Sequence, residues 1–325
     1  MDFKGYTYGY DGKLGDFRSE NGLASQELLY EIGINWVCIC FTVLQDTAVS
    51  TDIKFDFGTG VSDRDIIAAV SNAHNHGVKV CLKPMVNCKD ETWRARIDFP
   101  DMCQNDEPIE QDIYWNKWFD SYGNFLKYYA QLAKETGCEM LCVGCEMCGT
   151  ERKETHWRKL LNEVKNIYDG KLIYNTNHGH EKDVLWFDMV DYVGTSAYFP
   201  VGENGATYEN MLERWENVAK ELEEVHKMWN KKIVFIEIGC RSASTCSAMP
   251  WDFSHTDLPH DEQEQAMFYD TCLKTFSDKE WFGGMFWWDW STYIYNDKET
   301  ASKDNGFNIH LKKAEQTLKN WYLRL

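Results

Sequence analysis

A short apolar run followed by an amphipathic stretch recurs eight times along the 325 residues, and this recurrence constrains the fold most strongly. An alternation of buried strands with helices is typical of a parallel sheet. Eight such units favour a sheet that closes into a barrel over an open, doubly wound sheet. The predicted strands are 6–10, 36–41, 78–86, 140–145, 172–176, 190–197, 233–238 and 284–288.

Several of the intervening stretches carry helix signals. Residues 62–75 begin with Ser62, which suits a helix N-cap, and place Ile66, Ile67 and Val70 at helical spacing. No Gly-x-Gly-x-x-Gly motif opens a helix, so a dinucleotide is not expected. We therefore predict an α/β protein with one domain over residues 1–325, a (β/α)8 TIM barrel. Its further helices are expected over 113–136, 208–229, 262–275 and 313–325.

Polar residues that end the predicted strands are the candidates for chemistry, because TIM-barrel enzymes work at the C-terminal ends of their strands. The fourth apolar run leads directly into Glu146, and the seventh contains Glu237 at its end. With strict alternation along a strand, Glu237 is expected to point the same way as Phe235, and Glu146 the same way as Cys142.

A carboxylate at the mouth of an apolar strand is costly unless it is paired or has a function. The structural alternative is a salt bridge, for which Arg241 is available to Glu237. Two such glutamates, on the fourth and seventh strands, favour a functional pair. Cleavage of a glycosidic bond uses two carboxyl groups, one to protonate the leaving oxygen and one to attack the anomeric carbon or activate water. The first must be neutral and the second charged, so their environments must differ.

The positions of Glu146 and Glu237 resemble those in the clan of retaining β-glycosidases with a (β/α)8 barrel. In closer detail the chain resembles glycoside hydrolase family 113, the β-mannanases, over nearly its whole length. The resemblance is carried by GYTYG at 5–9, LKPMVN at 82–87, VGCEM at 143–147, GTSAYFP at 194–200, FIEIGCRS at 235–242 and FWWDW at 286–290.

This resemblance implies a retaining hydrolase of β-1,4-mannosidic bonds, with Glu146 as acid/base and Glu237 as nucleophile. Alternatives within the same chemistry are hydrolysis of another β-glycan, or transglycosylation. The clan often has Asn directly before the acid/base, where this chain has Cys145, so the side chain that binds the sugar 2-hydroxyl stays open.

Other polar and aromatic residues at the strand ends are candidates for substrate binding, with loop packing as the alternative for each. In the clan, a tyrosine after the sixth strand often hydrogen-bonds the nucleophile, and Trp residues at strand eight suit a stacking platform. Arg241 is either a substrate-site residue or structural. The candidates are Asn87, Asn177, His178, Tyr198, Arg241, Trp288 and Trp290.

Three rival interpretations are open. Cys138, Cys142 and Cys145 have the C-x3-C-x2-C spacing of radical S-adenosylmethionine enzymes, but Cys142 and Cys145 should point to opposite faces of a strand. Neighbouring histidines, such as His178 with His180, suggest a metal, but zinc needs three or four convergent ligands. A sugar-binding module without catalysis would use the 14 Trp residues, but would not need two glutamates. We expect no metal and no cofactor.

Charge and cysteine content limit partners and location. A net charge of −18 argues against nucleic acid and anionic membranes, whereas a neutral glycan is compatible with it. The start of the sequence does not resemble a secretion signal, which favours a cytoplasmic location unless a signal has been removed. Many of the twelve cysteines lie in apolar runs, as Cys38 and Cys40 do, so buried, reduced thiols are expected.

Overall fold

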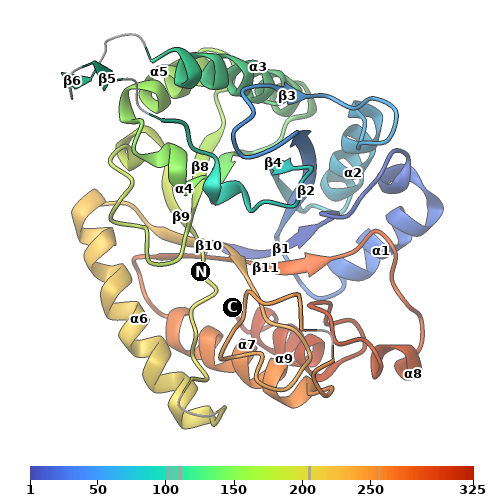
Figure 1. Cartoon of the computed structure of the whole chain (residues 1–325). Helices are drawn as coiled ribbons and strands as arrows, with labels where there is room; N and C mark the ends of the chain where they lie inside the picture. The colour runs from blue at the N-terminus through green and yellow to red at the C-terminus, as the bar shows by residue number, and fades with distance from the viewer. Residues whose placement is uncertain (101–102, 105–106, 109–111, 204–205, 256) are drawn as a thin grey trace.

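Eight parallel strands form the centre of the molecule and close into a barrel, because β1 pairs with both β11 and β2 (Figure 1). The computed structural model describes residues 1–325 except 101–102, 105–106, 109–111, 204–205 and 256. Every predicted strand overlaps a barrel strand, and the predicted (β/α)8 fold is confirmed. The barrel strands are β1 (Phe3–Tyr8), β2 (Trp36–Gln45), β4 (Lys79–Cys88), β7 (Met140–Cys145), β8 (Lys171–Asn177), β9 (Tyr192–Ser196), β10 (Ile233–Ile238) and β11 (Phe282–Trp290).

Helices cover the outside of the barrel (Figure 1). The predicted start at Ser62 is confirmed, since Ser62 and Asp65 form a reciprocal capping box at the start of α2. Helix α3 ends at Gly137, whose φ of 75° suits a residue without a side chain. The long helices are α1 (Glu20–Tyr30), α2 (Asp63–Asn75), α3 (Ile113–Thr136), α5 (Glu154–Lys165), α6 (Tyr208–Trp229), α7 (Glu262–Phe276) and α9 (Lys313–Tyr322).

One barrel unit lacks an α-helix. Residues 178–191, all of them described, connect β8 to β9 and contain only the 3-10 helix η3 (Phe187–Met189). The remaining elements are short insertions in the connections. They are η1 (Asp16–Arg18), β3 (Ile53–Lys54), η2 (Arg94–Arg96), β5 (Cys103–Gln104), β6 (Glu107–Pro108), α4 (Cys148–Glu151) and α8 (Lys298–Ala301).

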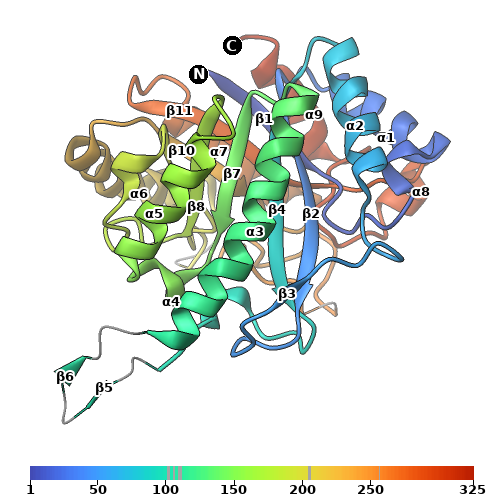
Figure 2. The ribbon, with the colours of Figure 1, turned by 90° about the horizontal axis from the view of Figure 1, so that it is seen from above.

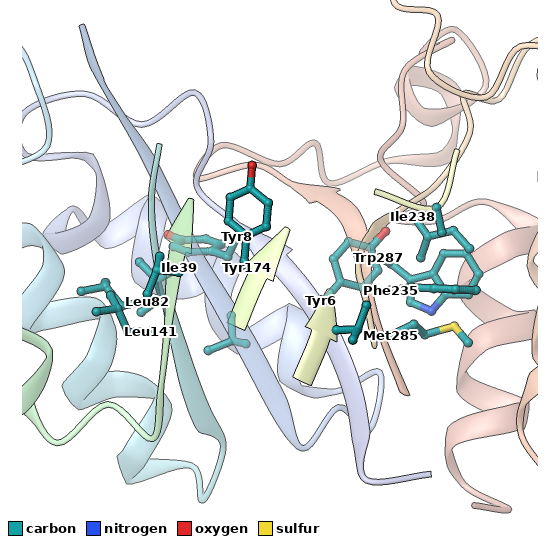
Figure 3. Close-up of a cluster of buried hydrophobic side chains, with 14 of the residues drawn as sticks. Tyr6, Tyr8, Ile39, Leu82, Leu141, Tyr174, Phe235, Ile238, Met285 and Trp287 are labelled. Carbon is teal, nitrogen blue, oxygen red and sulfur yellow. The ribbon is translucent and has the colours of Figure 1, made fainter. Parts of the chain in front are cut away.

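Apolar side chains fill two layers, one inside the barrel and one between the barrel and the helices. The inner layer contains Phe3, Trp36, Cys38, Ile236 and Phe286. The outer layer is larger, and Figure 3 shows part of it, with labelled side chains from seven of the eight barrel strands. Removal of this apolar surface from water is the main stabilising contribution to the fold.

The two ends of the barrel differ. The N- and C-termini lie together at one end in both views (Figures 1 and 2), and the Lys4 ammonium donates to the Tyr322 carbonyl, 2.9 Å away. The strands point toward the opposite end, where β3 and the hairpin of β5 and β6 project (Figure 2). In the described part of the chain, no helix is long and apolar enough to span a membrane.

Bulges break the alternation of side chains at the ends of β7 and β10. In β10 the register shifts between Phe235 and Glu237, so that Phe235 packs outward against Phe276 and Phe282 while Glu237 reaches Lys83 inside the barrel. The prediction that Glu237 and Phe235 point the same way is therefore wrong. One extra residue in a strand changes which face the following side chains occupy.

The same correction applies to β7, where the register shifts between Cys142 and Cys145. Cys142 lies in the inner layer, and Cys145 packs against Cys40 and Met85 of the neighbouring strands, also inside the barrel. The expectation that these two thiols occupy opposite faces is wrong. Glu146 follows with a φ of 49°, a left-handed conformation that few side chains adopt.

Candidate active site

Glu237 lies at the C-terminal end of β10 with its two carboxylate oxygens in different surroundings. Its Oε1 forms an ion pair with the Lys83 ammonium and accepts hydrogen bonds from Cys145 Sγ and Asn175 Nδ2, each 3.2 Å away. Its Oε2 accepts from the hydroxyl of Tyr198 at 3.3 Å. Donors from three other strands and the loop after β9 thus converge on this one carboxylate.

These donors keep Glu237 ionised. Burial would raise its pKa, but the positive charges of Lys83 and Arg94 and the hydrogen bonds outweigh burial, and the pKa is lowered. Lys83 is fully buried, so its charge acts through little intervening water. A carboxylate whose lowered pKa favours the charged form suits a nucleophile.

Glu146 follows β7 and has a different environment. Its Oε2 accepts from Arg94 Nη1 at 2.8 Å and from Trp93 Nε1 at 3.2 Å. Burial and the nearby negative charge of Glu237 raise its pKa, and they outweigh the lowering effect of Arg94 and Trp93. The site therefore holds one carboxyl group whose pKa is raised beside one whose pKa is lowered, which is the direction of difference that an acid and a nucleophile require.

Asn87 and Trp288 form one wall beside these carboxyl groups. The side-chain oxygen of Asn87 accepts a hydrogen bond from Arg94 Nε at 2.9 Å, and its side-chain nitrogen donates to the Tyr10 hydroxyl at 3.1 Å. The ring centroid of Tyr10 lies 4.7 Å from that of Trp288, and the Lys83 ammonium lies 5.8 Å from the Trp288 centroid. Trp288 is partly exposed next to the charged residues.

Asn177 and His178 lie at the end of β8, and neither has a described hydrogen bond to Glu146 or Glu237. The His178 ring stacks on Trp251 with 5.6 Å between centroids. Burial lowers the pKa of His178 to about 4, so its ring is neutral at pH 7. Its Nδ1 is buried and has no hydrogen-bond partner among the described residues.

Two of the predicted substrate residues are engaged elsewhere. Trp290 is fully buried, and its indole N–H donates to the Ser25 carbonyl at 2.9 Å, so the prediction that it stacks on a sugar is wrong. It points outward from β11 toward α1, although strict alternation would place it on the same face as Trp288, because the register between β1 and β11 shifts between Tyr6 and Tyr8. For Arg241 the structure supports the structural alternative over a pairing with Glu237, because its guanidinium binds Asp252 at 3.0 Å and the His255 carbonyl at 2.7 Å.

Besides Cys145, which was considered only as a possible cluster ligand, sequence reasoning missed four side chains that contact the two glutamates. Lys83 lies inside the apolar strand β4. A buried ammonium needs a negatively charged or hydrogen-bonding partner, so its position in the sequence was a signal of a polar site. Asn175 lies inside β8 and gave the weaker signal of a polar residue in a buried strand. Trp93 and Arg94 lie in the connection after β4, where no periodicity could place them.

The three cysteines with cluster-like spacing do not converge. Cys138 precedes β7, and its carbonyl accepts from the Tyr168 hydroxyl at 2.7 Å, whereas Cys145 ends the same strand beside Glu237. The length of β7 separates these thiols, which argues against a shared iron–sulfur cluster. Eleven cysteines have described side chains, all with free thiols, and ten of them are buried.

The chain is similar to known proteins over its whole length. The family model for Glycoside Hydrolase Family 113 matches residues 6–312. A solved GH113 β-1,4-mannanase is 36% identical, with both chains covered completely and a TM-score of 0.87. GH113 β-mannanase AaManA from Alicyclobacillus acidocaldarius, in complex with ManMIm, is 36% identical over 99% of this chain and 97% of its own, with a TM-score of 0.89.

More distant structures share the fold alone. A β-D-glucuronidase from Dictyoglomus thermophilum is 14% identical, with a TM-score of 0.64, and the match spans all of this chain and 51% of that protein. No curated protein sequence matches the chain.

Proposed function

The chain belongs to glycoside hydrolase family 113, and from this premise we propose that Glu146 is the acid/base and Glu237 the nucleophile of a retaining β-1,4-mannanase. The opposite electrostatic environments of the two carboxyl groups are the observation that carries this assignment. Lys83 and Arg94 lower the pKa of Glu237 against the effect of burial, while burial and Glu237 raise that of Glu146.

The first step consumes the charge of Glu237. Its Oε2 attacks the anomeric carbon, the bond to the leaving oxygen breaks, and Glu146 transfers its proton to that oxygen. Arg94 and Trp93 both donate to Oε2 of Glu146, so Oε1 is the oxygen that carries the proton. The product of this step is a glycosyl ester on Glu237 and a free sugar end.

The second step reverses the role of Glu146. Esterification of Glu237 removes the negative charge that raises the pKa of Glu146, so this pKa falls and Glu146 stays in the carboxylate form that can accept a proton. It takes a proton from water, the water oxygen attacks the anomeric carbon, and the ester bond to Glu237 breaks. Two inversions at one carbon give net retention.

The wall beside the glutamates supplies contacts for a neutral sugar. Trp288 offers an aromatic face to the C–H surface of a pyranose, and Asn87 and Tyr198 offer groups that bind hydroxyls. We extend this role to Asn177 and His178 at the end of β8. The net charge of −18 is compatible with an uncharged glycan and disfavours an anionic one.

Substrate choice and stereochemistry are tested together. The protein is incubated with β-1,4-mannan, manno-oligosaccharides, cello-oligosaccharides and xylan, and the products are separated by chromatography. We expect manno-oligosaccharides from mannan, with the β-anomer appearing first in proton NMR spectra. A first-formed α-anomer would contradict the retaining mechanism, and cleavage of another glycan in preference to mannan would contradict the substrate.

The buried thiols support a location in a reducing compartment, and we propose the cytoplasm. Ten of the eleven described cysteines are buried and all eleven are free, a state that oxidising compartments rarely preserve. Mass spectrometry of protein from its native cells tests this proposal. Reduced cysteines are expected, and three or more disulfides would refute it.

A further inference from the structure

We propose that Cys145 is a positioning residue for the nucleophile, because its thiol donates to Oε1 of Glu237 and so presents Oε2 to the anomeric carbon. The inference rests on the proposed function and deepens it, since it assigns a role to the residue directly before the acid/base.

The bulge in β7 is what brings Cys145 to Glu237. The register between β7 and β8 shifts after Cys142, and Cys145 then points into the barrel. Its Sγ lies 3.2 Å from Glu237 Oε1 and 3.1 Å from Asn175 Nδ2. Without the bulge, the thiol would face the helices and would not reach the carboxylate.

Cys145 is a donor because its thiol stays protonated. Only 2% of the residue is exposed, and burial together with the negative charge of Glu237 raises the pKa of the thiol well above its usual value. Asn175 Nδ2 lies 3.1 Å from the sulfur and 3.2 Å from Oε1, and an amide nitrogen only donates, so the acceptor for the S–H is Oε1 of Glu237. A thiolate at the same place would repel the carboxylate.

The result is a division of labour between the two oxygens of Glu237. Oε1 is held by Lys83, Cys145 and Asn175, so its lone pairs are occupied. Oε2 accepts only the Tyr198 hydroxyl among the described hydrogen bonds, at the longer distance of 3.3 Å. Oε2 is therefore the oxygen free to form the bond to carbon.

Removal of the thiol donor should destabilise the charged form of Glu237 and so raise the pKa of its carboxyl group. The pKa of Glu237 is set by titratable and charged groups from several elements, and only the hydrogen bond from Cys145 is removed in the variant. These groups are Lys83, Arg94, Glu146, Tyr10, Tyr198, Asp289 and the thiols of Cys38, Cys40, Cys142 and Cys145.

The test measures kcat/KM against pH for wild type, Cys145→Ala and Cys145→Ser on an aryl β-mannoside with a good leaving group. Such a substrate needs no proton from Glu146 in the first step. The fall of kcat/KM at low pH, the acidic limb, therefore reports the protonation of Glu237. We expect Cys145→Ala to move this limb up by roughly one pH unit and to lower the plateau about tenfold. Cys145→Ser keeps a donor and should leave the limb in place.

Cys81→Ala is the matched control, because Cys81 is also fully buried inside the barrel but has no described contact with Glu237. It should lower the melting temperature without moving the limb. An unmoved limb in Cys145→Ala, or an equal shift in Cys145→Ser, would overturn the proposal. If Cys145→Ala does not fold, Cys145→Val, which fills the space without a donor, is measured against the same two outcomes.

The controls also separate this proposal from the one on which it rests. A wild-type protein that cleaves neither β-1,4-mannan nor aryl β-mannosides contradicts the proposed function. A wild-type protein that cleaves them, with a limb that Cys145→Ala leaves unmoved, contradicts only the role of Cys145.

Discussion

Arg94 Nη1 lies 2.8 Å from Oε2 of Glu146, so a buried guanidinium is bound to the residue that we propose as the general acid. A cation beside a carboxyl group favours the charged form, whereas an acid must be neutral to donate its proton. Burial and the charge of Glu237 outweigh Arg94, and the pKa of Glu146 is raised. Arg94 therefore limits how far that pKa rises and fixes which oxygen faces the substrate.

Arg94→Met should move the basic limb of kcat/KM on mannan to higher pH. The variant removes an effect that lowers the pKa of Glu146 and leaves the two effects that raise it. Activity at neutral pH should fall, because Glu146 and Asn87 both lose a hydrogen-bond donor. Arg158→Met serves as the control, since Arg158 forms its ion pairs with Glu154 and Asp188 on the surface. A basic limb that stays in place in Arg94→Met would contradict this role.

Lys83→Met should abolish most activity and also destabilise the fold. Loss of the ammonium leaves the Glu237 carboxylate buried without its partner, which costs about 3–5 kcal/mol of unfolding free energy. The pKa of Glu237 is lowered in the fold, so its contribution to stability is present at neutral pH and is lost as the pH falls through that lowered pKa.

The comparison for Lys83→Met is therefore the free energy of unfolding against pH, measured with denaturant for wild type and variant. The difference between the two proteins should be large at pH 7 and should shrink in acid, where Glu237 becomes protonated. A difference that does not change with pH would mean that Lys83 contributes by packing alone.

Trp288 and Trp290 should respond to alanine in opposite ways, although two positions separate them. Trp288→Ala removes the partly exposed ring beside the carboxyl groups and should reduce activity on mannan, with a smaller loss of stability than Trp290→Ala. Trp290 is fully buried, so Trp290→Ala should cost about 3–5 kcal/mol of stability. Activity per folded molecule is measured for both, together with the melting temperature. Equal losses of activity per folded molecule would contradict the assignment of these two rings.

The sequence predicted the fold well because each barrel strand is buried on both faces and is therefore a continuous apolar run. The strand ends were less predictable. The bulges after Cys142 and Phe235 depend on the register with neighbouring strands, which a single strand's sequence does not contain. Strict alternation therefore assigned Cys145 and Glu237 to the wrong faces.

The two glutamates were predictable as candidates because they end apolar strands, but most of their partners were not. Arg94 and Trp93 reach Glu146 from an irregular connection. They precede Glu146 in the sequence by 52 and 53 positions, and only the folded chain brings them into contact with it. Tyr198, which hydrogen-bonds Glu237, was a candidate because it lies just after a strand end. Trp290 was misassigned because the local pattern did not distinguish its face from that of Trp288.

Alanine variants of the two glutamates should differ according to the leaving group. Glu146→Ala should lose about 10²–10⁴-fold on mannan, whose leaving oxygen needs a proton, and far less in the first step with an activated aryl mannoside. Added azide should replace water in the second step and give a β-mannosyl azide. Glu237→Ala should be inactive on both substrates, with any azide product of α configuration. The reversed pattern would exchange the two roles.

Identification of the residue that carries the sugar tests the two-glutamate account most directly. The protein is incubated with an activated 2-deoxy-2-fluoro-β-mannoside, whose glycosyl-enzyme breaks down slowly, and digested peptides are analysed by mass spectrometry. A label on Glu237, with one sugar per chain, is the result that the account predicts. A label on Glu146, or on any other residue, would contradict it.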